Sequence, residues 1–203
     1  MLMNAAIICY NRTLINSANF MKKTTVLFCL FFSFLSSAQT TLYLVRHAEK
    51  VTSSATKDPE LTAIGQFRAQ NIAKMLSNAG ISRIFSSDYQ RTMQTAQPLA
   101  DYLNLEIEIY RPEKLAQFAG ELKNSKENIL IVGHSNTTPK LAEYLSGQHI
   151  NSMTEEQYDT LYQVILIPKQ KAIVNHFKTI PSQALKQNKI IIPVQKKDTK
   201  HAN

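Results

Sequence analysis

Cysteine is scarce in this sequence, with two in 203 residues, Cys9 and Cys29, both within the first 38. If that segment is removed, the remaining chain has no cysteine, which excludes disulfide bonds and thiol chemistry. Long hydrophobic runs are also missing. The apolar run at 26–35 is too short to cross a bilayer, which takes about 20 residues. The sequence also lacks internal repeats and low-complexity linkers, so we expect a single domain.

The first 38 residues have the pattern of an export signal. Basic residues follow Met21, the apolar run comes next, and small residues at 36–38 suit a cleavage site. We therefore expect synthesis to begin at Met21 and cleavage to follow Ala38, with residues 1–20 an upstream extension. The mature protein would be periplasmic or secreted, with no stable membrane insertion.

The rest of the composition is ordinary for a globular protein, with 44% hydrophobic and 19% charged residues. The net charge of +8, which falls to +5 when residues 1–38 are removed, suits an anionic substrate, although solubility alone is the simpler explanation. We expect a phosphorylated small molecule as the partner and no nucleic acid; nothing in the sequence indicates the oligomeric state. The expected domain is 39–180, followed by a partly disordered tail at 181–203.

Strand and helix patterns alternate along the domain. Strands are expected at 41–46, 81–85, 105–110 and 128–132, and a hairpin at 162–167 and 172–179. Helices are expected at 61–78 with Thr62 as cap, from a cap in Ser86–Asp88 to 103, after Pro112, and from about 136 to 146. This order predicts an α/β fold, a three-layer α/β/α sandwich with a mostly parallel central sheet.

Candidate catalytic residues fall where two of these strands end. Arg46 and His47 end the first strand, and Gly133 and His134 end the strand at 128–132. Ligands of such sheets bind outside the carboxyl ends of the strands, so two histidines far apart in the chain can meet there.

Four ordered motifs resemble those of the histidine phosphatase (phosphoglycerate mutase-like) superfamily. They are the segment Leu44–Glu49 around Arg46-His47, the L-T-x-x-G helix start at Leu61–Gly65, the S-S-x-x-x-R-x-x-x-T-A stretch at Ser86–Ala96, and the second-histidine motif at Ile131–Ser135. The resemblance covers roughly 41–167. Ala48 replaces the family's usual glycine, a small-for-small change.

The resemblance implies that His47 is the nucleophile and that Arg46, Arg91 and His134 hold the phosphoryl oxygens. The chemistry agrees, because arginine's fork matches phosphate and stays charged, and neutral imidazole is an available nucleophile near pH 7. Phosphoryl transfer relies mainly on positioning and electrostatic stabilisation. We expect no cofactor and no metal, since no cysteine or carboxylate stands at ligand spacing and two arginines would repel a cation.

The sequence offers several candidates for the proton donor to the leaving oxygen. In many relatives a glutamate after the third strand has this role, and Glu113 is the leading candidate, with Glu121 further along. Glu49 and Asp58 are alternatives, and all of these could instead be solvated carboxylates. Other polar residues are interpreted as solvated or surface groups: Arg68, Arg83, His149, His176 and His201.

The sequence thus predicts an exported phosphatase that hydrolyses phosphomonoesters through a phosphohistidine on His47. Two alternatives are a phosphohistidine or phosphoprotein phosphatase and a phosphoglycerate mutase-like phosphotransferase. A non-enzyme alternative is a phospholigand-binding module, but binding alone does not need a nucleophile within reach of two arginines.

Overall fold

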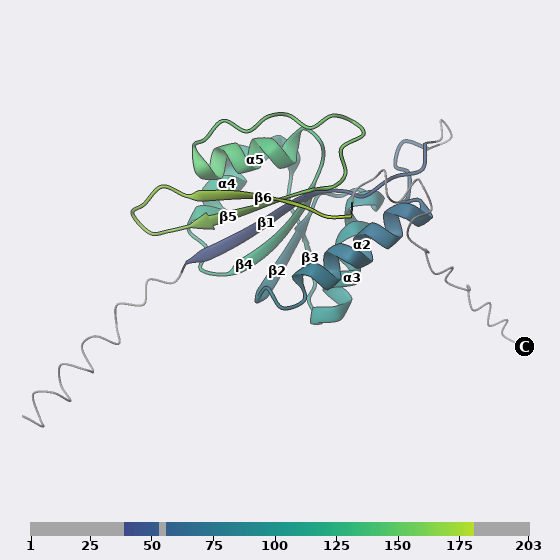
Figure 1. The fold of residues 1–203 in the computed structure, drawn as a ribbon, viewed down its shortest axis with the longest axis horizontal. Helices are drawn as coiled ribbons and strands as arrows, with labels where there is room; N and C mark the ends of the chain where they lie inside the picture. The colour runs from purple at the N-terminus through teal and green to yellow at the C-terminus, as the bar shows by residue number, and fades with distance from the viewer. Residues whose placement is uncertain (1–38, 53–55, 181–203) are drawn as a thin grey trace, which may run out of the picture. The chain divides into compact units, whose positions relative to one another are not determined.

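The computed structural model describes residues 39–52 and 56–180 (Figure 1). Six strands form one sheet in the spatial order β3-β2-β4-β1-β5-β6. Their bounds are β1 (Thr40–Arg46), β2 (Ile81–Ser86), β3 (Ile107–Ile109), β4 (Asn128–Gly133), β5 (Thr160–Leu166) and β6 (Ile173–Lys178). Strands β3, β2, β4 and β1 pair in parallel, whereas β5 pairs antiparallel with β1 and β6. The expected mostly parallel sheet is confirmed.

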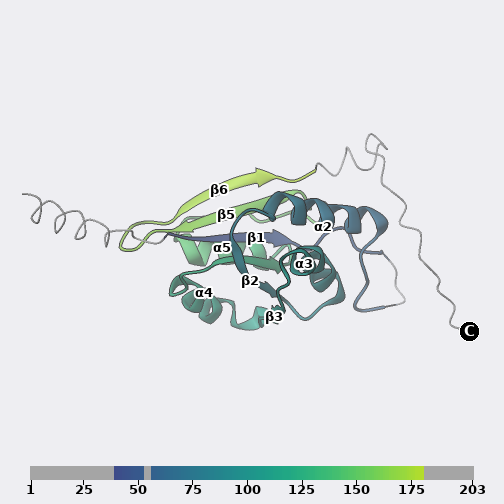
Figure 2. The same ribbon diagram turned by 90° about the horizontal axis from the view of Figure 1, so that it is seen from below.

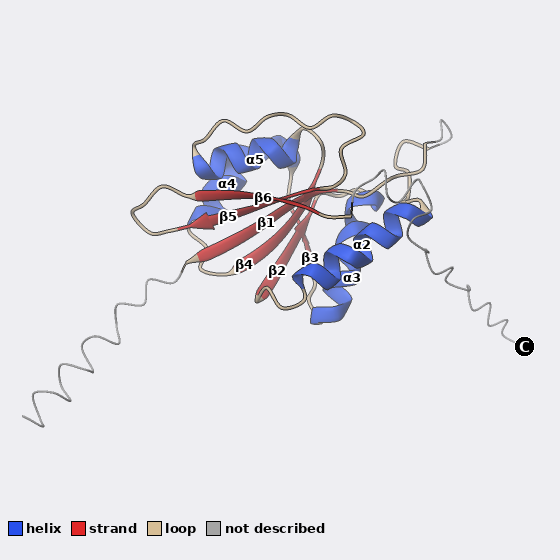
Figure 3. Ribbon diagram, in the orientation of Figure 1, coloured by secondary structure: helices blue, strands red, loops and turns tan. Residues whose placement is uncertain are grey.

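Helices cover both faces of this sheet (Figures 2 and 3). One pair is α2 (Ala63–Leu76) with α3 (Gln90–Leu103), and the other is α4 (Leu115–Lys123), which follows the short 3-10 helix η1 (Pro112–Lys114), with α5 (Thr137–Ser146). Strand β4 explains why two layers of helix are needed. Its residues Ile129 and Ile131 pack in the core with α4 and α5, while Leu130 and Val132 pack with α2 and α3. The three-layer α/β/α sandwich is confirmed.

Helix α2 begins as its sequence predicts. The Thr62 side chain accepts a hydrogen bond from the Gly65 N–H at 3.1 Å, which satisfies one of the unpaired donors of the first turn. The start of α2 also lies against the loop after β1, because the Thr62 N–H donates to the Glu49 carbonyl at 2.9 Å. A Cβ atom at Gly65 would stand 2.2 Å from that carbonyl oxygen, so glycine is required here for close backbone approach.

The start of α3 differs from the prediction that Ser86–Asp88 would supply the cap. The N-cap is Tyr89, which makes no side-chain cap bond. Both carboxylate oxygens of Asp58 instead accept from the Gln90 N–H, at 3.1 and 3.0 Å. The cap therefore comes from a residue 32 positions away. The Ser86 hydroxyl instead donates to the Ser87 carbonyl, and the Ser87 hydroxyl bonds Thr92 and His134.

The expected hairpin is present as β5 and β6, in a register that places Tyr162 opposite His176. Its turn contains Lys169 in the left-handed region at φ 61°. The predicted strand at 105–110 is shorter than expected, with three residues in β3.

Several sequence predictions fall outside the described residues: the start at Met21, cleavage after Ala38, His201 and the tail at 181–203. They stay predictions. Within the described ranges, none of the helices combines the length and apolar character that crossing a bilayer requires.

Candidate active site

The site lies at the carboxyl ends of neighbouring parallel strands. Arg46 stands opposite Gly133 in the register of β1 and β4, and the N–H of His47 donates to the Gly133 carbonyl at 2.9 Å. A Cβ atom at Gly133 would be 2.7 Å from the Tyr110 hydroxyl and 2.8 Å from Thr137 Oγ1. Glycine therefore lets the end of β4 pack closely against Tyr110 and Thr137. His47 and His134, which follow β1 and β4, lie at the same edge of the sheet.

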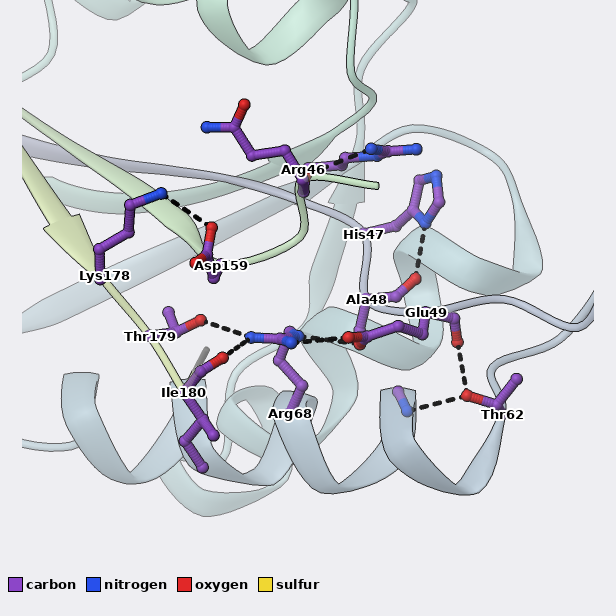
Figure 4. A network of polar contacts seen from close by, with 12 residues as sticks. Arg46, His47, Ala48, Glu49, Thr62, Arg68, Asp159, Lys178, Thr179 and Ile180 are labelled. Atoms are coloured by element: carbon purple, nitrogen blue, oxygen red, sulfur yellow. Dashed lines mark hydrogen bonds and ion pairs between the residues drawn. The ribbon is translucent and has the colours of Figure 1, made fainter. Parts of the chain in front are cut away.

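His47 is almost completely buried, with 3% of its surface exposed. Its Nδ1 lies 2.8 Å from the Ala48 carbonyl oxygen (Figure 4), so Nδ1 carries the proton and Nε2 presents a lone pair. The Ala48 N–H donates to Thr95 Oγ1 at 2.9 Å, which fixes the backbone beside the ring. The pKa of His47 is lowered to about 3, mainly by burial and also by the charge of Arg46, against the opposing effect of the hydrogen bond to Ala48. The ring is therefore a neutral imidazole near pH 7.

His134 faces His47 across the site. The ring centroids are 5.5 Å apart and the planes meet at 67°. Its Nε2 lies 2.9 Å from the Ser87 hydroxyl oxygen, which in turn lies 3.1 Å from Thr92 Oγ1. The pKa of His134 is lowered to about 4, first by burial and then by the positive charge of Arg91. Two neutral, oriented imidazoles therefore stand next to each other.

Arg46 is held by the segment that precedes β5. Its Nη1 donates to the carbonyls of Thr154 and Glu155 at 2.9 Å and of Gln157 at 3.2 Å, and its Nη2 to Glu155 Oε2 at 2.8 Å. The guanidinium carbon lies 4.2 Å from the centre of the Tyr158 ring. We call residues 154–157 the Arg46 loop. It fixes one edge of the guanidinium while the side chain is 1% exposed.

Arg91 is positioned from the other side. Its Nη1 donates to Asp58 Oδ1 at 3.2 Å, and its guanidinium carbon lies 4.3 Å from the centre of the Tyr89 ring. Tyr89 also packs edge-on against the His134 ring, with centroids 5.0 Å apart. The Tyr89 ring therefore contacts both Arg91 and His134.

One hydrogen-bond donor on each arginine is buried and unpaired. Among the described residues, Nε of Arg46 and Nε of Arg91 have no hydrogen-bond partner. A buried donor without an acceptor costs about 1–3 kcal/mol, so such groups are uncommon. Nε–H and a neighbouring Nη–H form the edge with which arginine grips a tetrahedral anion.

A pocket of about 470 Å³ opens beside these groups. Its lining combines charged, hydroxyl, amide and aromatic side chains: Tyr89, Arg91, Pro112, His134, Ser135, Asn136, Thr137 and Glu155. His47 lies deeper, next to His134. The volume is in the range of small-molecule sites, which reach from about 300 to 1,000 Å³.

The structure brings together the four residues that the sequence singled out, Arg46, His47, Arg91 and His134. Their chemical roles stay predictions. Glu113 lies on η1 with an exposed side chain, and its neighbour Pro112 is the residue of that segment that lines the pocket. Glu121 is exposed on α4 and bonds Gln117.

The prediction that Arg68 is a solvated residue is wrong, because its side chain on α2 is 0% exposed. Its Nε and Nη2 bind the two oxygens of Glu49 at 2.8 and 2.6 Å, and its Nη1 reaches Thr179 Oγ1 at 2.8 Å and the Ile180 carbonyl (Figure 4). The carboxylate two residues after His47 neutralises the buried charge.

The interpretation of the other polar residues as surface groups agrees with the structure where it describes them. Arg83 is on the surface, paired with Glu108 at 2.7 Å. His149 and His176 are exposed.

Sequence reasoning missed several residues around the site. Lys50 acts on His134 electrostatically, Thr95 and Ser87 fix the histidine segments, and Glu155 lines the pocket. Ser87 and Thr95 lie within a quoted motif, which was their signal. Glu155 lies in no motif and is placed by the path of the Arg46 loop alone. Across 39–52 and 56–180 we find no group of three or more histidine, cysteine or acidic residues suited to a metal ion; that the protein needs no metal stays a prediction.

The model of the histidine phosphatase superfamily (branch 1) matches residues 42–112. Similar curated proteins include the probable phosphoglycerate mutases GpmB of Yersinia enterocolitica, 37% identical over 71 residues, and of Proteus mirabilis, 39% identical over 71 residues. Each match covers 32% of this chain and 33% of the relative, so the chain matches about a third of the length of these proteins.

Solved structures resemble the chain over a larger part. The protein histidine phosphatase SixA, complexed with tungstate, has a TM-score of 0.57 at 20% identity, covering 68% of this chain and 96% of its own. A mycobacterial glucosyl-3-phosphoglycerate phosphatase has a TM-score of 0.57 at 13% identity, with coverages of 70% and 99%. Phosphoserine phosphatase of Entamoeba histolytica has a TM-score of 0.53 at 18% identity, with coverages of 69% and 97%. At these identities the likeness shows the fold.

Proposed function

We propose that this chain, which belongs to the histidine phosphatase superfamily, hydrolyses phosphomonoesters through a phosphohistidine intermediate on His47. The superfamily match supports phosphatase or mutase-like activity in general. The narrower proposal, that this chain hydrolyses its substrate, rests on the geometry of the site.

The observation that carries the proposal is the pair of buried, unpaired Nε–H groups on Arg46 and Arg91. A phosphoryl group would accept from both while His47 Nε2 attacks phosphorus. Two guanidinium groups stabilise the charge that spreads over the phosphoryl oxygens, and His134 adds a third polar contact. The leaving oxygen departs, and water then cleaves the phosphorus–nitrogen bond to release phosphate and restore the imidazole.

A mutase-like phosphotransfer is the second candidate, because the curated relatives are named probable phosphoglycerate mutases. It uses the same phosphohistidine but returns the phosphoryl group to a second hydroxyl rather than to water. The pocket at His134 is wide for one phosphoryl group, at about 470 Å³, which favours access of water and so favours hydrolysis. Release of inorganic phosphate, measured against isomerisation of 3-phosphoglycerate, separates the two.

The test of the proposal compares wild-type protein with His47→Ala, using p-nitrophenyl phosphate and phosphate release from sugar phosphates, nucleotides and phosphoamino acids. We expect turnover by the wild type, its loss in His47→Ala by at least about 10³-fold, and no effect of a chelator. The matched control is His149→Ala, since His149 is 81% exposed and lies away from the motifs; it should keep wild-type rates.

Two results would speak against a phosphatase. Activity that survives His47→Ala would exclude this nucleophile. Tight binding of phosphorylated ligands without any turnover would favour the phospholigand-binding module instead.

Export of the protein is part of the proposal. It is supported by the basic, apolar and small-residue order of residues 21–38. The mature protein would work in the periplasm or outside the cell. Sequencing the N-terminus of the cell-associated and released protein tests this, with Gln39 as the expected first residue.

A further inference from the structure

When the phosphorus–oxygen bond breaks, the leaving alcohol oxygen needs a proton. None of the two arginines and two histidines at the centre of the site is an acid suited to supply it. A carboxylic acid that protonates the leaving oxygen contributes roughly 10²- to 10⁴-fold in rate. Of the candidates from the sequence, Glu49 binds Arg68 and Asp58 binds the Gln90 N–H, and neither belongs to the lining of the pocket beside His134. Glu113 is exposed on η1 and does not belong to the pocket lining.

Glu155 is the one carboxylate in the lining of the pocket that also contains Arg91 and His134. Its Oε2 accepts from Arg46 Nη2 at 2.8 Å, and its Oε1 accepts from the Ser135 hydroxyl at 2.8 Å. Its carboxylate therefore bridges the arginine before His47 and the residue after His134. Each oxygen has one described partner, although an ionised carboxylate can accept about four hydrogen bonds in total.

The side from which each group reaches the phosphoryl unit also matters. In phosphoryl transfer the attacking and leaving atoms lie roughly in line on opposite sides of phosphorus. The nucleophile His47 is 3% exposed at the base of the site, so the leaving oxygen points outward. Glu155 is 73% exposed and belongs to the pocket wall, which places it on the leaving-group side.

A bound phosphoryl group would change the proton affinity of this carboxylate. In the structure, the Ser135 hydroxyl and then Arg46 lower the pKa of Glu155. A phosphoryl dianion at Arg46 adds negative charge beside Glu155 and competes for the same guanidinium. Both effects raise the pKa of the carboxyl group when substrate binds, and a proton can arrive with the monoanionic form of the ester.

We propose that Glu155 is the proton donor to the leaving oxygen, an inference that rests on the proposed phosphatase function. Its carboxyl proton moves to the ester oxygen as the phosphorus–oxygen bond breaks, the bond's electron pair stays on that oxygen, and the His47 Nε2–phosphorus bond forms. In the second step the Glu155 carboxylate takes a proton from the attacking water. The water oxygen bonds to phosphorus, and the phosphorus–nitrogen bond electrons return to Nε2.

The test compares two substrates in the full-length protein, because an acid matters most when the leaving group is poor. Glycerol 2-phosphate releases an alkoxide unless it is protonated, whereas p-nitrophenyl phosphate releases a stable phenolate. We expect Glu155→Gln to lower kcat/KM for glycerol 2-phosphate by roughly 10²- to 10⁴-fold more than for p-nitrophenyl phosphate. In the wild type we expect the rate with glycerol 2-phosphate to fall at alkaline pH, because the acid loses its proton. This fall should be absent in Glu155→Gln.

Two variants provide controls. Glu156→Gln changes the next residue of the same exposed loop, and Glu113→Gln changes the acid favoured by the sequence; neither should alter the ratio of the two substrates. Equal losses on both substrates in Glu155→Gln would show that Glu155 only positions Arg46 and would overturn the inference. A changed ratio of the two kcat/KM values in Glu113→Gln, with none in Glu155→Gln, would also overturn the inference. Inactivity of the wild type, or activity that remains in His47→Ala, would overturn the proposed function itself.

Discussion

Arg46 and Arg91 differ in how their guanidinium groups are fixed, yet each keeps a buried Nε–H without a described acceptor. Backbone carbonyls of the Arg46 loop hold the first, and Asp58 with the Tyr89 ring holds the second. Because both groups are fixed before any substrate arrives, little ordering is left to the moment of binding. This is the preorganisation that electrostatic catalysis requires.

The arginine geometry predicts a strong effect of Arg91→Lys. Lysine keeps the charge but lacks the planar fork and its Nε–H donor. A hydrogen bond to a charged group contributes about 1.5–3 kcal/mol, so kcat/KM for p-nitrophenyl phosphate should fall roughly 10- to 100-fold. The control is Arg83→Lys, on the surface with a side chain that is 37% exposed, which should leave the rate unchanged. Equal rates for wild type and Arg91→Lys would mean that Arg91 does not contact the phosphoryl group.

At the scale of elements, the position of the nucleophile depends on the contact between the loop after β1 and the start of α2. The Glu49 carbonyl accepts from the Thr62 N–H and lies beside Gly65, while the Glu49 carboxylate binds Arg68 one turn further along α2. The start of α2 and Arg68 thus hold Glu49, two residues beyond His47, through its carbonyl and its carboxylate.

This contact predicts that Gly65→Ala destabilises the protein, against the usual benefit of alanine in a helix. The added methyl group would stand 2.2 Å from a backbone oxygen, and overpacking of this kind costs about 1–3 kcal/mol. Gly120→Ala in α4 meets nothing within 4 Å and should stabilise by about 0.5–1 kcal/mol. Urea unfolding of the two variants checks this. A Gly65→Ala protein as stable as wild type would show that the loop can move away from α2.

Local sequence patterns predicted most elements because their causes are local. The Thr62 cap and the apolar stretch of β4 depend on a few consecutive residues, and both were confirmed. The cap of α3 was wrong because Asp58 arrives from a distant loop. The burial of Arg68 was missed for a similar reason, since its partners come from the loop after β1 and from the residues that follow β6.

In the site, too, features with a local cause could be predicted, and those that depend on distant residues could not. Motifs identified His47, His134, Arg46 and Arg91, since each follows or lies near the end of a strand that the sequence reveals. The carboxylate in the pocket, Glu155, has no such signal. Its place depends on three backbone carbonyls that turn toward Arg46, a fact that only the folded chain contains.

For the whole molecule, the two central histidines make stability depend on pH. Their pKa values are lowered to about 3 and about 4 in the folded protein, against about 6.5 when unfolded. The unfolded chain therefore binds more protons between these limits, and the stabilisation present above pH 6.5 is lost as the pH falls. From pH 7 to pH 5 we expect a loss of about 2 kcal/mol from His47, and less from His134, which solvent partly screens.

Urea unfolding at pH 7 and pH 5 measures this loss, in a range above the titration of most carboxylates. The double variant His47→Gln/His134→Gln should show a much smaller difference between the two pH values. A wild-type protein equally stable at both would indicate that the rings are already protonated, or exposed, in the folded state.

The bond from Arg68 to the backbone of Ile180 has a practical consequence for anyone who shortens this protein. A chain cut before Thr179 would keep every proposed catalytic side chain and the whole of β6, yet the buried guanidinium of Arg68, beside the loop after β1, would lose two oxygen acceptors. Such a protein should express poorly or lose activity for a reason that no inspection of the pocket would suggest. The useful boundary lies beyond residue 180.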